Sequence, residues 1–290
     1  MDVESGQLFG EIVQHEAYTL PARELRALEL YSSRFLSSNT PFTLVELGSG
    51  SNMTKLQAIT SGVNLSQVSI IATDIDKNSL DVIDSQSVPE AKSFQTIAGE
   101  MGEIPQRIAK PEEPIYHALF GSTFFGFSNS EMITFLSGKK EELRSQDRLI
   151  ITGDAGPDDQ SVDDIMAQYH PSFTADFKVI PTIRTINTIL YGVLDTPLSP
   201  NDFEYLPEWD QEELSVMHYL VPNKDIQICV KGRCFCLWCE GEKILNGRSA
   251  KWSARRMTTL AKKLGLEIQS FEDKSECINL YSLSIPLKQQ

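Results

Sequence analysis

The sequence has no long apolar run, and its opening residues, MDVESGQ, do not resemble a secretory signal peptide. We therefore expect a cytoplasmic protein with no membrane partner. Basic residues are in the minority, with 26 Lys and Arg against 40 Asp and Glu and a formal net charge of −14. Because nucleic-acid binding needs basic patches, this balance argues against a nucleic-acid partner. A chain of 290 residues can form one large domain or two modest ones, and we expect a monomer or a homodimer.

Histidine and cysteine are also scarce, which limits the metal sites that the chain could build. There are four scattered histidines and five cysteines, an odd number. Four cysteines cluster late in the chain, at Cys229, Cys234, Cys236 and Cys239. Residues 226–238 around them are typical of a hairpin that turns at Lys231-Gly232. We predict buried free thiols and no metal, because no Cys or His pair at zinc-finger spacing accompanies them; zinc held by the last three is the less favoured alternative.

What the sequence does contain is a strand, a glycine turn and a helix in succession. The apolar run 42–47 ends in Gly48-Ser49-Gly50, and a helix is expected over 53–61. Glycine at both positions permits a tight turn and a close approach of the backbone to a ligand. In a doubly wound α/β sheet such a turn presents backbone N–H groups at the carboxyl end of the strand.

Two further strand ends carry groups that suit a nucleoside. The run 68–75 carries Asp74 near its end, where a carboxylate can accept both hydroxyls of a ribose. A third run, 94–98, leads into Gly99-Glu100-Met101, a position where adenine edges are often read. The dinucleotide pattern G-x-G-x-x-G is absent. Together these strand ends favour S-adenosylmethionine over NAD as the cofactor.

The motifs occur in the same order as in the histidine-specific methyltransferases of the ergothioneine pathway, which the chain resembles from about residue 7 to residue 286. The resemblance is carried by six segments: VELGSGSN (45–52), ATDIDKNSL (72–80), AGEM (98–101), LFGST (119–123), RLIITGD (148–154) and RSAKW (248–252). It implies a Rossmann-like class I methyltransferase fold with a mostly parallel seven-stranded sheet and a smaller α+β substrate domain. It also implies trimethylation of an amino-acid α-amine by S-adenosylmethionine.

Strands and helices alternate through the first half of the chain, as in a parallel sheet covered by helices. We predict strands at 42–47, 68–74, 94–98, 115–120 and 148–153, with helices at 53–61, 77–84, 103–109 and 129–143. A return helix over 251–264 and an antiparallel strand pair, 266–271 and 278–285, close the sheet. Such a final pair is typical of class I methyltransferases.

Outside this alternation we expect a second domain. Residues 5–37 look helical, with one apolar stripe of Leu8, Ile12 and Val13 and another of Leu25, Leu28, Leu30 and Phe35. After Asp154 the pattern gives an acidic helix near 158–169, a long segment 173–190 interrupted at Pro181, and antiparallel strands at 217–221, 226–230 and 234–238. We assign 39–158 and 252–290 to the cofactor-binding domain, and 1–38 and 159–251 to a substrate or lid domain.

The cofactor-binding residues that we predict all fall on or beside the carboxyl ends of the parallel strands. They are Glu46, Gly48, Ser49, Gly50, Lys55, Asp74, Gly99, Glu100, Met101 and Gly121.

The resemblance places the acceptor on a different set of residues. Tyr169 aligns with the family's pocket tyrosine, whose hydroxyl can bind the substrate carboxylate and whose ring can face a methylammonium group; it is our candidate catalytic residue. Tyr18 resembles a lid residue, Met217 aligns with a residue under the substrate side chain, and Ser249 aligns with a hydroxyl that contacts the side-chain ring.

Two departures from the family's motifs change the expected acceptor. Gly126 stands where the family has the asparagine that holds the substrate amine, and Gly247 stands where it has the glutamate that reads imidazole N–H. Phe124, Phe125 and Phe127 add apolar bulk beside the first of these positions. Because a hydrogen-bonding site discriminates by what it leaves unpaired, histidine is expected to be a poor substrate. We include Phe125, Gly126 and Gly247 in the predicted substrate site.

Three functions are compatible with these residues. The preferred one is an N-methyltransferase (an enzyme of class EC 2.1.1) acting on the amine of a small molecule, an amino acid or an amino-acid derivative other than histidine. In the second, S-adenosylmethionine is itself the substrate: its amine attacks its γ-carbon and expels methylthioadenosine. The third is a non-catalytic relative that binds S-adenosylmethionine.

Overall fold

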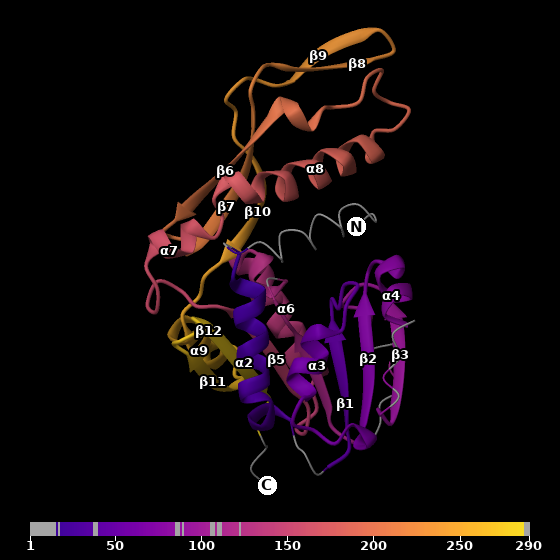
Figure 1. Cartoon of the computed structure of the whole chain (residues 1–290), viewed down its shortest axis with the longest axis vertical. Helices are drawn as coiled ribbons and strands as arrows, with labels where there is room; N and C mark the ends of the chain where they lie inside the picture. The colour runs from indigo at the N-terminus through magenta and orange to yellow at the C-terminus, as the bar shows by residue number, and fades with distance from the viewer. Residues whose placement is uncertain are drawn as a thin grey trace. The chain divides into compact units, whose positions relative to one another are not determined.

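The structure is a computed structural model that describes residues 16, 18–36, 40–84, 88, 90–104, 108, 112–121 and 123–286. The chain divides into two compact units, Leu20–Gln160 with Lys251–Gln290, and Met1–Thr19 with Ser161–Ala250 (Figure 1). In this division residues 20–38, which the sequence assigns to the substrate domain, group with the larger unit.

The larger unit contains a seven-stranded sheet in the order β11-β12-β5-β4-β1-β2-β3. Its strands are β1 (Phe42–Leu47), β2 (Val68–Asp74), β3 (Ser93–Ala98), β4 (Ile115–Leu119), β5 (Arg148–Asp154), β11 (Glu267–Asp273) and β12 (Ile278–Ser284). Strands β1 to β5 pair in parallel, whereas β12 is antiparallel to both β5 and β11. The predicted Rossmann-like class I methyltransferase fold is confirmed.

Helices follow the predicted alternation closely. They are α2 (Leu20–Phe35), α3 (Thr54–Thr60), α4 (Lys77–Asp84), α6 (Asn129–Glu142) and α9 (Ala254–Lys263), with short 3-10 turns η1 (Leu65–Gln67) and η2 (Phe124–Gly126). A capping box formed by Ser128 and Glu131 starts α6, and the Ser253 hydroxyl caps α9. The helix expected over 103–109 lies largely outside the described residues, as do Leu8, Ile12 and Val13.

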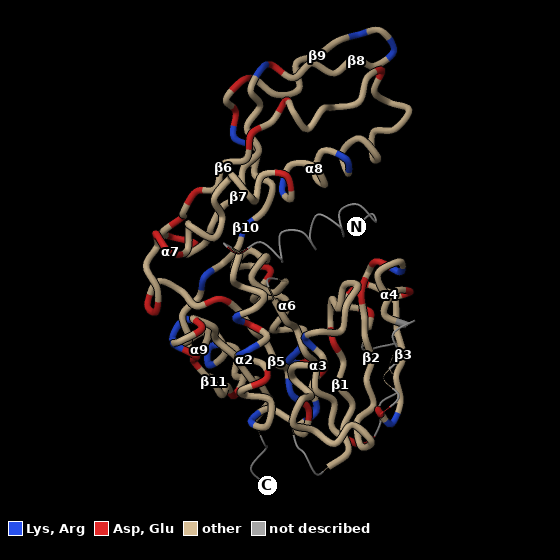
Figure 2. Tube along the Cα trace, viewed as in Figure 1, with Lys and Arg blue, Asp and Glu red and all other residues tan. Residues whose placement is uncertain are grey.

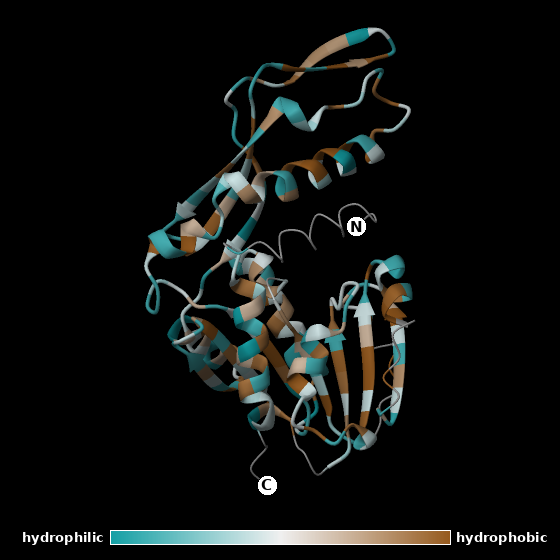
Figure 3. Ribbon diagram, in the orientation of Figure 1, coloured by the Kyte–Doolittle hydropathy of each residue, from teal (hydrophilic) through white to brown (hydrophobic). Residues whose placement is uncertain are grey.

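The core of this unit is the middle of the sheet. All six residues of β1 are buried, as expected for a parallel strand with helices on both faces. The brown, hydrophobic colouring of Figure 3 follows the central strands of this sheet. One expectation for α2 is wrong: Leu30 is 66% exposed, and the buried stripe is Leu20, Glu24, Ala27, Leu28, Ser32 and Phe35. A charged residue, Glu24, therefore lies on the inward face of the helix.

The smaller unit is an α+β unit built on an antiparallel sheet of order β10-β7-β6. Its elements are α7 (Val162–Ala167), α8 (Pro171–Ile189), η3 (Pro200–Asp202), β6 (Phe203–Asp210), β7 (Ser215–Pro222), β10 (Ile244–Ala250) and the separate hairpin β8 (Ile226–Val230) and β9 (Arg233–Trp238). Strand β10 was not predicted.

Helix α8 runs through Pro181, so the predicted interruption is wrong. Val179 and Ile183, on either side of the proline, are buried in one cluster with Phe203 and Leu220 of the sheet. The free energy gained by packing Val179 and Ile183 exceeds the cost of the backbone hydrogen bond that Pro181 cannot donate.

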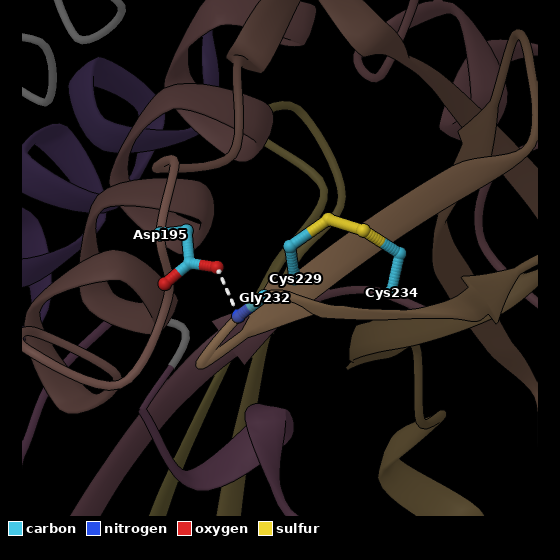
Figure 4. Close-up of a disulfide and its surroundings, with 4 residues drawn as sticks. All are labelled: Asp195, Cys229, Gly232 and Cys234. Carbon is cyan, nitrogen blue, oxygen red and sulfur yellow. Dashed lines mark hydrogen bonds between the residues drawn. A yellow bond between two sulfur atoms is a disulfide. The ribbon is translucent and has the colours of Figure 1, made fainter.

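The cysteines also correct a prediction. The β8–β9 hairpin turns at Lys231-Gly232 as expected, with φ of 51° and 73°. However, Cys229 and Cys234 form a disulfide, since they lie directly opposite each other in the hairpin (Figure 4). Cys236 and Cys239 are reduced but exposed, so the expectation of buried free thiols is wrong for all four.

Charged residues of both signs are interspersed along the two units (Figure 2). Within the described parts of the chain, no helix combines the length and apolar character needed to cross a membrane.

Candidate functional site

The glycine turn after β1 is held by the backbone of the neighbouring strand. The N–H groups of Gly48 and Ser49 both donate to the carbonyl of Thr73, at 2.8 and 2.9 Å. Gly48 and Gly50 have φ of 78° and 65°, a region that disfavours any residue with a β-carbon. A methyl group at Gly50 would meet no atom within 4 Å, so the outer side of this turn is open.

Asp74 joins the glycine turn to the end of β2. Its Oδ2 accepts from the N–H of Gly50 at 2.9 Å, and its Oδ1 accepts from the N–H of Asp76 at 2.9 Å. A carboxylate offers about four acceptor positions, so two remain for the hydroxyls of a ribose. The carbonyl of Asp74 accepts from Gly99 N–H at 2.9 Å, which ties the end of β3 to the same place.

Met101 completes this corner of the sheet. Its Cε would lie 3.5 Å from a methyl group placed on Gly48, and the Thr123 hydroxyl oxygen would lie 3.8 Å from the same methyl group. Glu100, next to Met101, is exposed. The ends of β1, β2 and β3 and the loop after β4 therefore converge around one glycine.

A buried carboxylate that the sequence analysis missed supports the turn from the side of α2. Glu24 Oε1 accepts from the N–H of Gly121 at 2.5 Å and from the hydroxyl of Thr152, while Oε2 lies 3.0 Å from Lys55 Nζ. The predicted cofactor ligand Lys55 is thus an ion-pair partner of Glu24. A side chain at Gly121 would strike the Lys55 ammonium group.

Glu46 lies in β1 just before the turn and is 3% exposed. Burial raises its pKa to about 7; Lys55 and the hydroxyl of Ser49 partly offset this effect, and Glu24 and Asp74 add to it. Its Oε2 and the hydroxyl oxygen of Ser49 are both buried.

These features fit the cofactor predicted from the sequence. The open glycine turn and the carboxylate of Asp74 suit the adenosyl sugar, and the buried oxygens of Glu46 and Ser49 suit a cationic amine. A cavity of about 640 Å³ is lined by residues of and around α3 and by residues 63–66, and none of the predicted site residues lines it.

The phenylalanines after β4 pack in two directions. Phe124 is fully buried, and its ring makes an edge contact with Phe127 and a tilted contact with Phe135 of α6. Phe124 therefore belongs to the core of the larger unit. Phe125 instead lies over Gly153, where a methyl group would strike its ring. It lines a small cavity together with Leu20, Glu24, Gly121, Gly153, Asp154 and Ile278.

Asp154, at the carboxyl end of β5, anchors the edge of this cavity. Its Oδ2 lies 2.6 Å from Lys251 Nζ and its Oδ1 lies 3.2 Å from Arg23, with the Lys251 and Asp154 side chains each 2% exposed. This buried ion pair joins β5 to the segment that leads into α9.

In the smaller unit, the predicted acceptor residues lie around a buried histidine. His218 of β7 is 1% exposed; its Nδ1 pairs with the Tyr205 hydroxyl at 2.7 Å and its Nε2 with the Ser249 hydroxyl at 2.9 Å. The ring of Tyr169 lies 5.2 Å from the imidazole. Burial and the neighbouring Tyr169 raise the pKa of Tyr205, so its hydroxyl stays neutral across the physiological range.

A comparison with known protein families decides what these sites belong to. Residues 2–285 match the family described as histidine-specific methyltransferase, SAM-dependent. The chain belongs to this family. It is therefore an S-adenosylmethionine-dependent methyltransferase, and the family implies a small-molecule substrate. A search of curated protein sequences gave no match.

Solved methyltransferase structures are similar to this chain at low sequence identity. CcbJ from Streptomyces caelestis is 12% identical, with 91% of this chain and 90% of CcbJ covered and a TM-score of 0.49. DesVI from Streptomyces venezuelae is 9% identical, with 99% and 100% covered and a TM-score of 0.44. The glycopeptide N-methyltransferase MtfA in complex with S-adenosylmethionine is 8% identical, with 91% and 94% covered and a TM-score of 0.46.

The structure of this methyltransferase gathers the predicted residues into two groups. The ten predicted cofactor residues, with Phe125 and Gly126, lie in the larger unit, whereas Tyr18, Tyr169, Met217, Gly247 and Ser249 belong to the smaller one. Gly247 and Ser249 of β10 pair with His218 and Val216 of β7, and Arg248 pairs with Met217. Tyr18 is half-buried.

Sequence reasoning missed Glu24, Thr152, Tyr205 and the role of His218. A signal for Glu24 was available, because it lies four residues after Leu20 and four before Leu28 on one face of α2. No comparable signal marks His218, since strand residues of either face could carry a histidine.

Proposed function

We propose that this methyltransferase transfers methyl groups to the amine of a small molecule, an amino acid or an amino-acid derivative other than histidine. Glu46, Gly48, Ser49, Gly50, Asp74 and Met101 would hold S-adenosylmethionine, which supplies an activated methyl group when bound. The protein then has to present a neutral amine in line with the carbon–sulfur bond.

The main support for an acceptor other than histidine is the hydrogen bond between Ser249 and His218. The hydroxyl that aligns with the family's contact to a substrate imidazole already pairs with an imidazole of the protein itself, at 2.9 Å. The second polar contact expected for a substrate imidazole is missing too, because residue 247 is glycine. A substrate imidazole would compete with His218 for the Ser249 hydroxyl, and displacing His218 would leave a buried ring nitrogen unpaired, at a cost of about 1–3 kcal/mol.

Tyr169 remains the candidate for orienting the acceptor. It is 3% exposed in a cluster with Ile165 and Val216, and its ring faces the Tyr205–His218–Ser249 chain. In the larger unit, Gly126 stands where the family has the asparagine that holds the amine, and the neighbouring Phe125 is apolar. We infer that the acceptor is apolar or aromatic and that desolvation lowers the pKa of its amine.

Mass spectrometry tests the proposal directly. The enzyme is incubated with S-adenosylmethionine and a pool of amino acids and biogenic amines, with histidine alone as a matched comparison. We expect mass gains of one, two or three methyl groups on a compound other than histidine. Efficient methylation of histidine would refute the proposal.

A parallel incubation with S-adenosylmethionine alone separates the alternatives. Methylthioadenosine released without any acceptor would mean that the cofactor is itself the substrate. Binding of S-adenosylmethionine with no methylated product and no methylthioadenosine would instead indicate a non-catalytic protein.

A further inference from the structure

The hairpin of the smaller unit gathers two thiols and a carboxylate at its base. Asp225 lies just before β8, Cys236 lies within β9, and Cys239 follows β9 after a Cys-x-x-Cys spacing. One side-chain ligand atom from each residue lies within 4.8 Å of the other two, and all three residues are exposed.

The spacing of the two sulfur atoms fits a tetrahedral soft cation. Cys236 Sγ and Cys239 Sγ are 4.0 Å apart. Two thiolates at a zinc–sulfur distance of about 2.3 Å with a tetrahedral angle lie about 3.8 Å apart. Only a small movement of either side chain would bring both sulfurs to an ion.

Backbone hydrogen bonds hold the ligands in place. Asp225 Oδ1 accepts from the N–H of Glu240 at 2.9 Å, and Glu242 Oε2 accepts from the N–H of Cys239 at 3.0 Å. The Trp238 ring packs edge-on against Phe203 at 5.8 Å, which fixes the end of β9 to the hydrophobic cluster of the smaller unit. The loop therefore has its shape before any ion binds.

The neighbouring disulfide separates this pair of thiols from the other cysteines of the hairpin. Cys229 and Cys234 are bonded to each other, so Cys236 and Cys239 are the two reduced thiols among residues 226–239, all of which are described.

We propose that Asp225, Cys236 and Cys239 bind a zinc-type divalent cation, with water in the remaining position of a tetrahedral shell. The donor set of two thiolates and one carboxylate suits zinc, whereas calcium and magnesium prefer oxygen alone. The site lies outside the residues proposed for methyl transfer.

Titration of the full-length protein with Co²⁺ under argon and without added reductant tests the site. Tetrahedral thiolate coordination gives charge-transfer and d–d absorption, and added Zn²⁺ should abolish both at about one equivalent. Cys236→Ser should remove the charge-transfer band, and Asp225→Asn should weaken Zn²⁺ binding by at least about tenfold. Asn keeps an oxygen that can accept from Glu240, so the loop can retain its shape.

Two matched controls should leave binding unchanged. Glu240→Gln removes an exposed carboxylate beside the site, and Cys277→Ser removes a thiol of the larger unit. Circular dichroism checks that each variant folds. The proposal fails if Co²⁺ gives no thiolate absorption, if Cys236→Ser leaves it intact, or if intact-mass analysis finds Cys236 and Cys239 joined in a second disulfide.

Discussion

The carboxyl edge of the sheet and the histidine cluster of the smaller unit hold their polar groups in opposite ways. At the sheet edge, Asp74 is positioned by backbone N–H groups beside an open glycine turn, and Glu46 and Ser49 present buried oxygens. In the smaller unit, Tyr205, His218 and Ser249 bond to one another through their side chains. The first arrangement is open to a ligand, and the second is already satisfied.

This difference suggests how one part of such an enzyme can stay constant while the other diverges. Backbone groups at glycine turns bind a shared cofactor without depending on many side chains. An acceptor is recognised by side chains, which single substitutions replace. The proposed change of acceptor therefore concerns side chains of the acceptor site and not the backbone of the glycine turn.

The largest expected effect concerns the buried ion pair at the sheet edge. Lys251→Met would leave the Asp154 carboxylate, 2% exposed, without its 2.6 Å partner, and we expect a loss of about 3–5 kcal/mol in the free energy of unfolding. Urea denaturation measures it. Lys77→Met, which breaks a 2.6 Å pair with 73% and 59% exposed side chains, should change stability by less than about 0.5 kcal/mol. Equal effects would mean that the edge is not rigidly held by this pair.

The second-largest expected effect is a pH dependence of the free energy of unfolding, which arises from Glu46. Its pKa in the folded protein is about 7, above the ordinary value of 4.5, so the folded state keeps a proton that the unfolded state has lost. Stability from this group is therefore full below pH 4.5 and declines as the pH rises through 7, by roughly 3 kcal/mol in total. Glu46→Gln should remove that decline.

Chemical denaturation of both proteins between pH 4.5 and 8 checks this expectation. A control is Glu267→Gln, which removes an exposed carboxylate of the same unit. Calorimetry adds a second readout, because binding a cationic cofactor below pH 7 should release a proton from Glu46. If the stability of the parent and that of Glu46→Gln changed with pH in the same way, Glu46 would be excluded as the cause of the pH dependence.

Next in size is the contribution of Asp74 to cofactor binding. Asp74→Ala should weaken the binding of S-adenosylmethionine by about 1–3 kcal/mol, through the loss of charge-assisted hydrogen bonds to the ribose and of the bond that holds Gly50. Isothermal titration calorimetry measures the affinity. Asp74→Asn keeps one acceptor oxygen, so its affinity for S-adenosylmethionine should lie between those of the parent and of Asp74→Ala. Asp81→Ala, at an exposed position of α4, should bind S-adenosylmethionine with the affinity of the parent. Unchanged affinity of Asp74→Ala would remove this residue from the site.

The smallest expected effect concerns the hydrogen-bonded cluster of Tyr205, His218 and Ser249 in the smaller unit. Tyr205→Phe removes the 2.7 Å bond to His218, and we expect a loss of about 1 kcal/mol in stability because a buried ring nitrogen loses its partner. Thermal unfolding measures it, with Tyr191→Phe, at a 90% exposed position, as the matched control. If the variant is as stable as the parent, the cluster is less tightly satisfied than its distances indicate.

Much of the larger unit could be predicted because its pattern is local. Apolar runs of strand length, each followed by a helix, fix the β1 to β5 succession, and glycines mark the turn after β1. The smaller unit was less predictable. Val179 and Ile183 keep α8 intact through Pro181, and β10 forms only because β7 offers it a partner.

The residues of the candidate site also differ in how well the sequence predicts them. Gly48, Gly50 and Asp74 could be found from sequence because their positions at strand ends determine where they lie. The contacts of Glu24 and Thr152 with Gly121 could not, since these residues come from α2 and β5 and meet Gly121 only in the folded unit.

The sequence by itself determined the alternating α/β succession, the glycine turn and the family's motifs, because these depend on residues that are close along the chain. The tertiary structure alone decided which buried polar groups meet. Glu24 reached Gly121 across 97 residues, and His218 reached Ser249 across 31. A buried polar atom needs a partner wherever the fold supplies one, and no local pattern specifies which residue that will be.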